Sequence, residues 1–299
     1  MPDNPQRPSS AVAGPLPPVS GQPFALPDYR ILSLSGRDAL AFAQAQFMND
    51  VDALADGQWH WNGWLTPKGR IIALFALLRI DAQHLWLLLA DADPEALAGA
   101  LRRFVFRSKI TMEVIDEKPV SGSFSAPEAA RGNAFATLDN GALELDLGTA
   151  SEPRRMRLGN AADEAPARAA RWRRDDLRHG LPHLLGEQVE HWTPQQLSLE
   201  RLRAFSVKKG CYPGQEIVAR THFLGKVKRG LVAIAADAPL ASGQELQSGD
   251  RMIGPLVSTA DDGACWSALA VVPLADERPA LRVGATPVRE VALLDGLAR

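Results

Sequence analysis

One stretch of the sequence combines a cysteine with a cluster of basic side chains. It runs from Val207 to Leu231, and Cys211 lies there between two glycines, shortly after Lys208 and Lys209. A structural cysteine usually lies among apolar neighbours, whereas the residues around Cys211 are typical of a loop. Nearby ammonium groups favour the thiolate, the form that attacks electrophiles, exchanges disulfides or binds metal ions. The sequence therefore predicts that Cys211 is reactive rather than structural.

The same stretch is strongly basic, with six Lys or Arg side chains from residue 208 to 229 against one acid, Glu216. Such a cluster beside a thiol suits an anionic ligand or a tail that carries a carboxylate. A solvated basic loop packed against the following domain is the alternative. Cys211 and His222 would supply two metal ligands, but a structural zinc site needs four. No metal site made of protein ligands alone is therefore predicted.

Other chemistries lack their signatures. The sequence contains no Walker loop, no G-x-G-x-x-G after a strand, no H-E-x-x-H and no G-x-S-x-G. A formal net charge of -2 argues against a broadly basic surface for nucleic acids. Two cysteines far apart indicate a reducing cytoplasm rather than a disulfide scaffold. The longest apolar stretch, Ile71 to Leu78, is too short to span a membrane and is typical of a buried strand.

The pattern of elements predicts an α+β fold. Residues 1–27 include eight prolines and are expected to form a disordered tail. A β-α-β-β-β-α-β succession follows over 28–118. Its predicted strands cover 29–34, 58–65, 70–80, 84–90 and 111–115. Ser35 is expected to cap the first helix, which runs to about Phe47, and Asp93-Pro94 is expected to open the second.

The middle of the chain, 119–225, is less regular. Strands are predicted at 143–147 and 155–158, and a helix over 165–178 is rich in arginine. A solvated helix face is the usual explanation for such a run, and an anion-facing surface is the alternative. From residue 226 to 299 short strands and turns predict a small antiparallel barrel or sandwich. Cys265, in the largely apolar run Ala264–Val272, is expected in its core.

The motif K-G-C-Y-P-G-Q-E, followed by G-K-V-K-R, resembles the signature of the YgfZ-type folate-binding proteins. These are relatives of the glycine-cleavage T-protein, an aminomethyltransferase, and of mitochondrial iron–sulfur assembly factors. F-A-Q-A-Q-F-M-N-D-V, P-K-G-R, H-G-L-P and P-Q-Q-L agree with it, so that the resemblance runs from about residue 28 to the C-terminus. It implies three domains around a central channel: two α+β domains, 28–118 and 119–225, and a C-terminal antiparallel β-barrel, 226–299. Tetrahydrofolate or a one-carbon derivative would bind in the channel.

Three positions depart from the T-protein pattern. Ala73 and Leu74 replace an acidic pair that acts in aminomethyl transfer, and apolar side chains cannot accept a proton. Cys211 lies where the T-protein has no cysteine. Arg178 lies where a glutamate holds the pterin edge. Asp176 and Glu200 are nearby acids that could substitute, with an ordinary exposed acid as the alternative for each.

The resemblance makes Cys211 the candidate reactive thiol, and several motif positions become candidate folate contacts. For Asn49, Asp50, Lys68 and Arg70 the alternative is simple turn and cap chemistry. The candidate contacts are Asn49, Asp50, Lys68, Arg70, Asp176, Arg178, Glu200, Tyr212, Lys226 and Arg229.

The resemblance implies a tetrahydrofolate-binding accessory protein that supports iron–sulfur cluster synthesis or repair, and so the iron–sulfur enzymes that modify transfer RNA. Cys211 would act on a folate-derived one-carbon unit, a persulfide or a cluster iron. Its partners would be folate and iron–sulfur enzymes or assembly proteins, with no membrane. A folate-dependent aminomethyl- or methyltransferase is the second hypothesis, and catalytic turnover stays open. Direct transfer-RNA binding through the basic stretch is the third, disfavoured by the overall charge.

Overall fold

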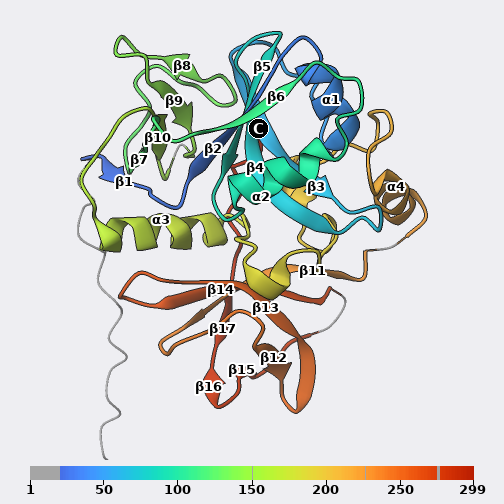
Figure 1. Ribbon diagram of the computed structural model, residues 1–299. Coiled ribbons are helices and arrows are strands. Elements are labelled where there is room, and N and C mark those ends of the chain that lie inside the picture. Colours follow the sequence, from blue (N-terminus) through green and yellow to red (C-terminus); the bar gives the residue numbers. More distant parts are fainter. Residues whose placement is uncertain (1–20, 150, 226, 275–276) are drawn as a thin grey trace, which may run out of the picture.

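Three antiparallel β-sheets organise the molecule (Figure 1). The computed structural model describes residues 21–149, 151–225, 227–274 and 277–299. Its mixture of helices and sheets, with a nearly closed seven-stranded sheet at the C-terminal end, confirms the predicted α+β class with a C-terminal barrel. No helix in these described ranges is long and apolar enough to cross a membrane.

The first sheet has the strand order β3-β4-β5-β2-β6. With helices α1 and α2 it reproduces the predicted β-α-β-β-β-α-β succession. One face of the sheet packs against these two helices, while the other faces the centre of the molecule. Burial on both faces explains why β4 is an unbroken apolar run rather than an alternating one. The elements are β2 (Arg30–Ser35), α1 (Ala39–Gln46), β3 (Gln58–Leu65), β4 (Ile71–Arg79), β5 (His84–Leu89), α2 (Pro94–Arg102) and β6 (Thr111–Ile115).

The capping residues predicted for helices α1 and α2 can be compared with the structure. The Asp93 carboxylate accepts hydrogen bonds from the backbone N–H groups of Glu95 and Ala96, which confirms the predicted start of α2. The predicted Ser35 cap is wrong, because Ser35 is the last residue of β2 and pairs with neighbours on both sides. Helix α1 begins at Ala39, after Asp38.

The second sheet has the order β1-β7-β10-β9-β8. Its first strand corrects the predicted N-terminal tail: residues 1–20 lie outside the described ranges, but 21–27 are ordered. Phe24 is fully buried and contacts the rings of Phe124 and Trp172, so an aromatic anchor outweighs the local proline content. The strands are β1 (Phe24–Ala25), β7 (Val120–Ser123), β8 (Ala136–Thr137), β9 (Leu143–Asp146) and β10 (Arg155–Leu158).

Helix α3 (Pro166–Arg178) lies between the second sheet and the barrel (Figure 1). Its five arginines all contact other parts of the protein, so neither a solvated face nor an anion-facing surface describes them. Arg168 and Arg171 lie over the Phe24 and Phe124 rings, and the other three form ion pairs with Asp28, Asp262 and Glu152. The charge run thus holds the helix in place.

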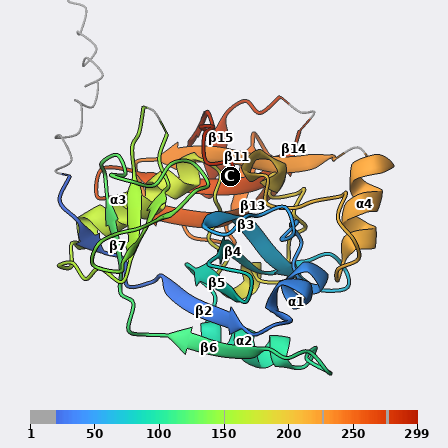
Figure 2. The same cartoon turned by 90° about the horizontal axis from the view of Figure 1, so that it is seen from above.

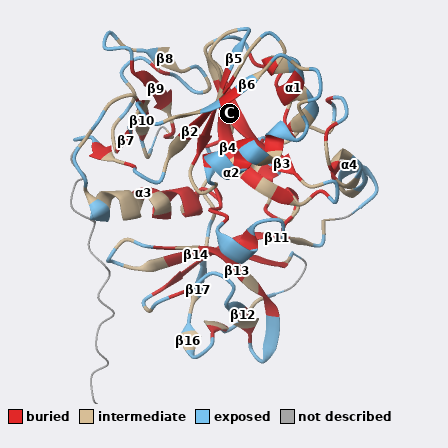
Figure 3. Ribbon diagram, in the orientation of Figure 1, coloured by how far each residue is buried: buried red, intermediate tan, exposed pale blue. Residues whose placement is uncertain are grey.

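The third sheet forms the C-terminal barrel, with the order β16-β15-β12-β13-β14-β11-β17. Its inner face carries a core of aliphatic side chains, seen as buried strands in Figure 3. The expectation that Cys265 lies in this core is wrong: it is only half-buried, in the turn before β14. The strands are β11 (Arg229–Ala236), β12 (Glu245–Ser248), β13 (Arg251–Asp261), β14 (Trp266–Pro273), β15 (Leu281–Val283), β16 (Thr286–Pro287) and β17 (Arg289–Val291).

The C-terminal segment after β17 returns from the barrel to the centre of the molecule, over β3 (Figure 2). There Leu297 is buried, and its carbonyl accepts a hydrogen bond from the indole N–H of Trp61. The backbone N–H of Leu294 donates to the carbonyl of Arg178. The last residues of the chain therefore join the barrel to the other two sheets.

Candidate functional site

Cys211 lies in a loop between the short 3-10 helix Leu199–Leu202 and helix α4 (Gln215–Phe223). Helix α4 was not predicted, although its residues form a run without glycine or proline between Gly214 and Gly225. Gly214 has a positive φ of 82° and packs closely on the turn before β4. A Cβ there would lie 2.7 Å from the Cα of Gly69. The requirement for glycine at this position is therefore both conformational and steric.

Lys209 anchors the loop. Its side chain is buried, and its Nζ donates hydrogen bonds to the carbonyls of Gln44, Phe47 and Asn49 at 2.6, 2.6 and 3.1 Å. These carbonyls lie at the C-terminal end of α1, where a cation is favoured. Burial lowers the pKa of Lys209 to about 8, and the nearby Asp50 opposes that shift. The Lys209 ammonium therefore uses its three N–H groups for backbone carbonyls at the end of α1 and has none left for a ligand.

Three further candidates surround this anchor. The Asn49 side chain donates to the carbonyls of Trp61 and Arg203, and its oxygen accepts from the backbone N–H of Asp50, so it joins distant segments as well as the local turn. The Asp50 carboxylate accepts a hydrogen bond from Gln44 at 2.8 Å. Tyr212 is buried over Lys209, and its hydroxyl donates to the carbonyl of Ser206. The structure thus brings Asn49, Asp50 and Tyr212 together as supports of the loop.

The Cys211 side chain itself is exposed. In the described part of the chain no hydrogen-bond partner of its thiol is found, and no group of three or more His, Cys, Asp or Glu side chains could hold a metal ion. Cys211 is therefore a free thiol on a loop that buried contacts hold in place.

Two other candidates, Arg70 and Arg229, meet at a recess beside α4. The cavity has a volume of about 280 Å³, and Lys228 also lines it. Arg70 donates to the carbonyl of His191 and to Gln196, while Arg229 donates to two carbonyls of the barrel. The motifs P-K-G-R, P-Q-Q-L and G-K-V-K-R, far apart in the sequence, converge here.

Asp176 lies elsewhere, at the centre of the molecule, where it is buried and fully engaged. It accepts hydrogen bonds from Arg154 at 2.8 Å, from the Tyr29 hydroxyl at 3.1 Å and from His183 at 3.3 Å. Burial, the largest single influence, would raise the pKa of Asp176, but the charges and hydrogen bonds of Arg154 and His183 together lower that pKa. The other ring nitrogen of His183 lies 2.8 Å from Asp91.

The histidine of this network carries a raised pKa. Burial alone would lower it, but Asp91 and Asp176 together raise the pKa of His183 to about 9. The space enclosed beside the network is a cavity of only about 20 Å³. That volume is enough for about one water molecule.

The remaining candidates are scattered. Arg178 pairs with Glu152 at 3.0 Å. Lys68 and Glu200 are exposed, and neither lines the recess beside α4. Lys226 lies outside the described residues. The pair Ala73 and Leu74 lies on β4, with Ala73 buried and Leu74 half-buried against the central core.

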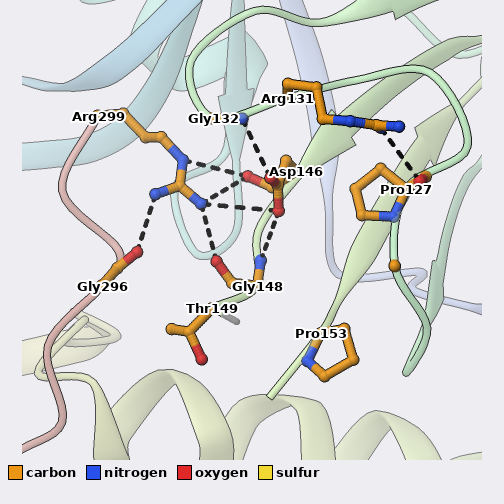
Figure 4. Close-up of a pocket in the computed structure, with 10 residues that line it drawn as sticks. Pro127, Arg131, Gly132, Asp146, Gly148, Thr149, Pro153, Gly296 and Arg299 are labelled. Carbon is orange, nitrogen blue, oxygen red and sulfur yellow. Dashed lines mark hydrogen bonds and ion pairs between the residues drawn. The ribbon is translucent and has the colours of Figure 1, made fainter. Parts of the chain in front are cut away.

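A larger cavity of about 630 Å³, missed by the sequence analysis, lies beside the C-terminal segment (Figure 4). Its lining includes Arg131, Asp146 and Arg299. The Arg299 guanidinium donates to the carbonyls of Asp146 and Gly148, and the Asp146 carboxylate accepts from the N–H groups of Gly132 and Gly148. No short motif marks it, because its walls come from three distant segments.

The fold is that of an aminomethyltransferase. A solved structure of glycine cleavage system aminomethyltransferase T from Bartonella henselae matches with a TM-score of 0.66 and 15% identity, covering 91% of this chain and 84% of that one. At the level of sequence, the chain is 26% identical over 266 residues to the tRNA-modifying protein YgfZ of Colwellia psychrerythraea, covering 80% and 82% of the two chains.

An uncharacterized protein of Haemophilus influenzae is 28% identical over 256 residues, covering 81% of this chain and 86% of the relative. No family model matches the sequence. The comparisons confirm the resemblance to YgfZ-type proteins that the cysteine motif indicated, on the fold of the aminomethyltransferases.

Proposed function

We propose that this protein is a folate-binding accessory protein of the YgfZ type that uses the Cys211 thiol to support iron–sulfur cluster synthesis or repair. Iron–sulfur enzymes that modify transfer RNA would be its clients. The observation that carries the proposal is the exposed thiol of Cys211 on a loop anchored by the buried Lys209. The clients are inferred from the family resemblance.

The geometry favours work on a macromolecular partner. An exposed thiol is open to the surface of another protein, whereas a thiol inside a cavity is open only to small molecules. The hydrogen bonds of Lys209 and Tyr212 fix the backbone of the loop. The position of Cys211 therefore does not depend on a hydrogen bond to its thiol. Such preorganisation lowers the entropic cost of engaging a client.

A one-carbon derivative of tetrahydrofolate, when bound, would supply a one-carbon unit, whereas tetrahydrofolate itself would accept one. The cavity beside Arg299 fits it, since about 630 Å³ lies within the range of roughly 300–1,000 Å³ typical of ligand sites. Arg131 would hold a carboxylate of the glutamyl tail, since its Nε has no acceptor among the described residues. The guanidinium of Arg299 already donates to backbone carbonyls from Nε, Nη1 and Nη2, so Arg299 shapes the wall of the cavity. Asp146, which lines this cavity, would accept hydrogen bonds from the amino-pyrimidinone edge. Asp176 does not line the cavity, and its oxygens accept three hydrogen bonds from the protein.

A folate-dependent aminomethyltransferase is the second candidate, favoured by the likeness of the fold. Ala73 and Leu74 count against it, because an apolar pair cannot accept a proton from the aminomethyl group. A reconstituted glycine-cleavage assay distinguishes the two functions, and measurable turnover would favour the transferase.

The main test compares the two cysteines. In a strain that lacks the gene, we expect Cys211→Ser to fail to restore iron–sulfur enzyme activity, whereas Cys265→Ser restores it. Both variants should fold, since neither thiol is part of the core. Full complementation by Cys211→Ser would refute a role for the thiol.

Folate binding is tested separately by calorimetric titration with tetrahydrofolate. We expect Asp146→Asn to weaken binding by roughly tenfold or more, the effect of losing a charged acceptor. Glu200→Ala, which removes an exposed acid elsewhere, should bind like the wild type. No binding to the wild type removes the folate part of the proposal and leaves the Cys211 part standing.

A further inference from the structure

The recess beside α4 gathers cationic side chains without an acid to neutralise them. Arg70, Lys228 and Arg229 line its volume of about 280 Å³. The other lining residues in the described part of the chain are Thr193, Gln195, Gln196, Thr221 and Val227. Three positive charges therefore share a polar cavity that contains no carboxylate among these residues.

Each of the three cationic side chains has N–H groups that are not used in hydrogen bonds among the described residues. Arg70 uses only Nη1 for His191 and Gln196, and Arg229 uses only Nη2 for the two barrel carbonyls. Their remaining guanidinium N–H groups have no acceptor among the described residues. Lys228 is exposed and has no side-chain partner within the described ranges. Donors from three separate segments thus remain for a ligand.

The walls of the recess are preorganised. The Gln196 side-chain oxygen that holds Arg70 also accepts from the backbone N–H and the hydroxyl of Thr193, at 3.1 and 3.2 Å. Gln195 is buried and donates to the carbonyl of Val218 in α4 at 2.8 Å. Two of the three cations are therefore fixed before any ligand arrives, and this reduces the entropic cost of binding.

We infer that this recess binds a phosphate ester joined to a hydroxylated unit, such as a ribose phosphate. Guanidinium forks and an ammonium are the usual partners of phosphate oxygens. Three positive charges match a dianion better than a single carboxylate. The volume exceeds that of a phosphate group alone, and the hydroxyl and amide groups of Thr193, Thr221 and Gln196 suit sugar hydroxyls.

The site is separate from the cavity beside Arg299 and does not depend on folate binding or on the role of Cys211. It is nevertheless built on the same unit as the thiol. Arg70 follows Gly69, which packs against Gly214 of the cysteine loop, and Thr221 belongs to the helix that this loop opens. A phosphorylated ligand would therefore lie on the element that presents Cys211.

The test is a calorimetric titration of the full chain at low ionic strength with ribose 5-phosphate and, in a second arm, with a short oligoribonucleotide. We expect Lys228→Gln to weaken binding by roughly tenfold. Lys68→Gln is the matched control, because Lys68 is an exposed lysine of the adjoining turn that does not line the recess. The control should bind like the wild type, and both variants should keep the wild-type melting temperature.

The two arms distinguish the source of the phosphate. Loss of ribose 5-phosphate binding in Lys228→Gln supports a small phosphorylated molecule, and loss of oligonucleotide binding alone supports a polynucleotide backbone. The inference is overturned if neither probe binds the wild type, or if Lys68→Gln and Lys228→Gln weaken binding equally. It is also overturned if ribose or succinate binds as tightly as ribose 5-phosphate.

Discussion

The centre of the molecule and the cysteine loop both bury a cation, but they use it differently. At the centre, Arg154 and His183 both donate to Asp176 inside a buried charged network, in which Nη2 of Arg154 has no hydrogen-bond partner among the described residues. At the loop, Lys209 points inward to backbone carbonyls while the next side chain but one, Cys211, stays exposed. The first arrangement joins three sheets, and the second presents one reactive group.

The difference lies in where the partners come from. The central network takes Asp91 from just after β5, Arg154 from just before β10 and Asp176 from α3. The backbone N–H of His183 donates to the hydroxyl of Ser258 in the barrel. Its members are all charged groups, so removing one of them leaves another buried charge without its partner. The loop anchor contains a single charge and neutral carbonyls, and it leaves the surface free for a partner.

The largest expected effect is on the central network. Asp176→Ala leaves Arg154 buried without its counter-charge, and we expect a loss of about 3–5 kcal/mol in the free energy of unfolding. Chemical denaturation measures it. A stable Asp176→Ala variant that has lost folate binding would instead assign Asp176 to the ligand, as the sequence suggested.

The next effect concerns pH. Because the pKa of His183 is raised from its usual 6.5 to about 9, its stabilisation is fully present below pH 6.5 and is lost as pH rises towards 9. The loss amounts to on the order of 3 kcal/mol over that window. We expect unfolding experiments from pH 6.5 to 9 to show this decline in the wild type.

His183→Gln is the control for the pH effect and should show a flatter profile. Lys209, whose pKa burial lowers to about 8, titrates at the upper end of the window. The difference between wild type and variant is therefore best compared between pH 6.5 and 8. Parallel profiles in the two proteins would contradict the assignment to His183.

The smallest expected effect is a difference in unfolding free energy between substitutions of two adjacent lysines. Lys209→Met removes three hydrogen bonds to backbone carbonyls, and we expect a loss of about 2 kcal/mol in unfolding free energy. Lys208→Met, an exposed neighbour, should change it by less than about 0.5 kcal/mol. Equal effects of the two substitutions would show that Lys209 does not anchor the loop.

Much of the local structure was predictable from the sequence. The bounds of β3, β6 and β10 agree with the predicted 58–65, 111–115 and 155–158, because the alternation of side chains along a strand is a local property. The start of α2 followed from Asp93 and Pro94. Strand β1 was missed because its two residues are ordered by aromatic contacts with segments a hundred or more residues away.

The candidate site was predictable only in part. The exposed loop around Cys211 was predictable from its glycine-rich and basic neighbours. The ten candidate folate contacts, in contrast, lie in several different parts of the structure. Asn49, Asp50 and Tyr212 support the loop, Arg70 and Arg229 line a recess, and Asp176 belongs to the centre. A sequence motif identifies residues that occur together along the chain, but it does not show which of them line the same cavity.

The sequence by itself determined the strands and helices of the first sheet, the glycine-dependent loop and the free cysteine within it, since these depend on neighbours a few residues apart. Only the tertiary structure decided which charges are buried. Lys208 and Lys209 are chemically identical and adjacent, yet one is exposed and the other is buried against α1, more than 150 residues away. The free energy of a buried charge depends on the groups that surround it in space, and those groups are brought together by folding.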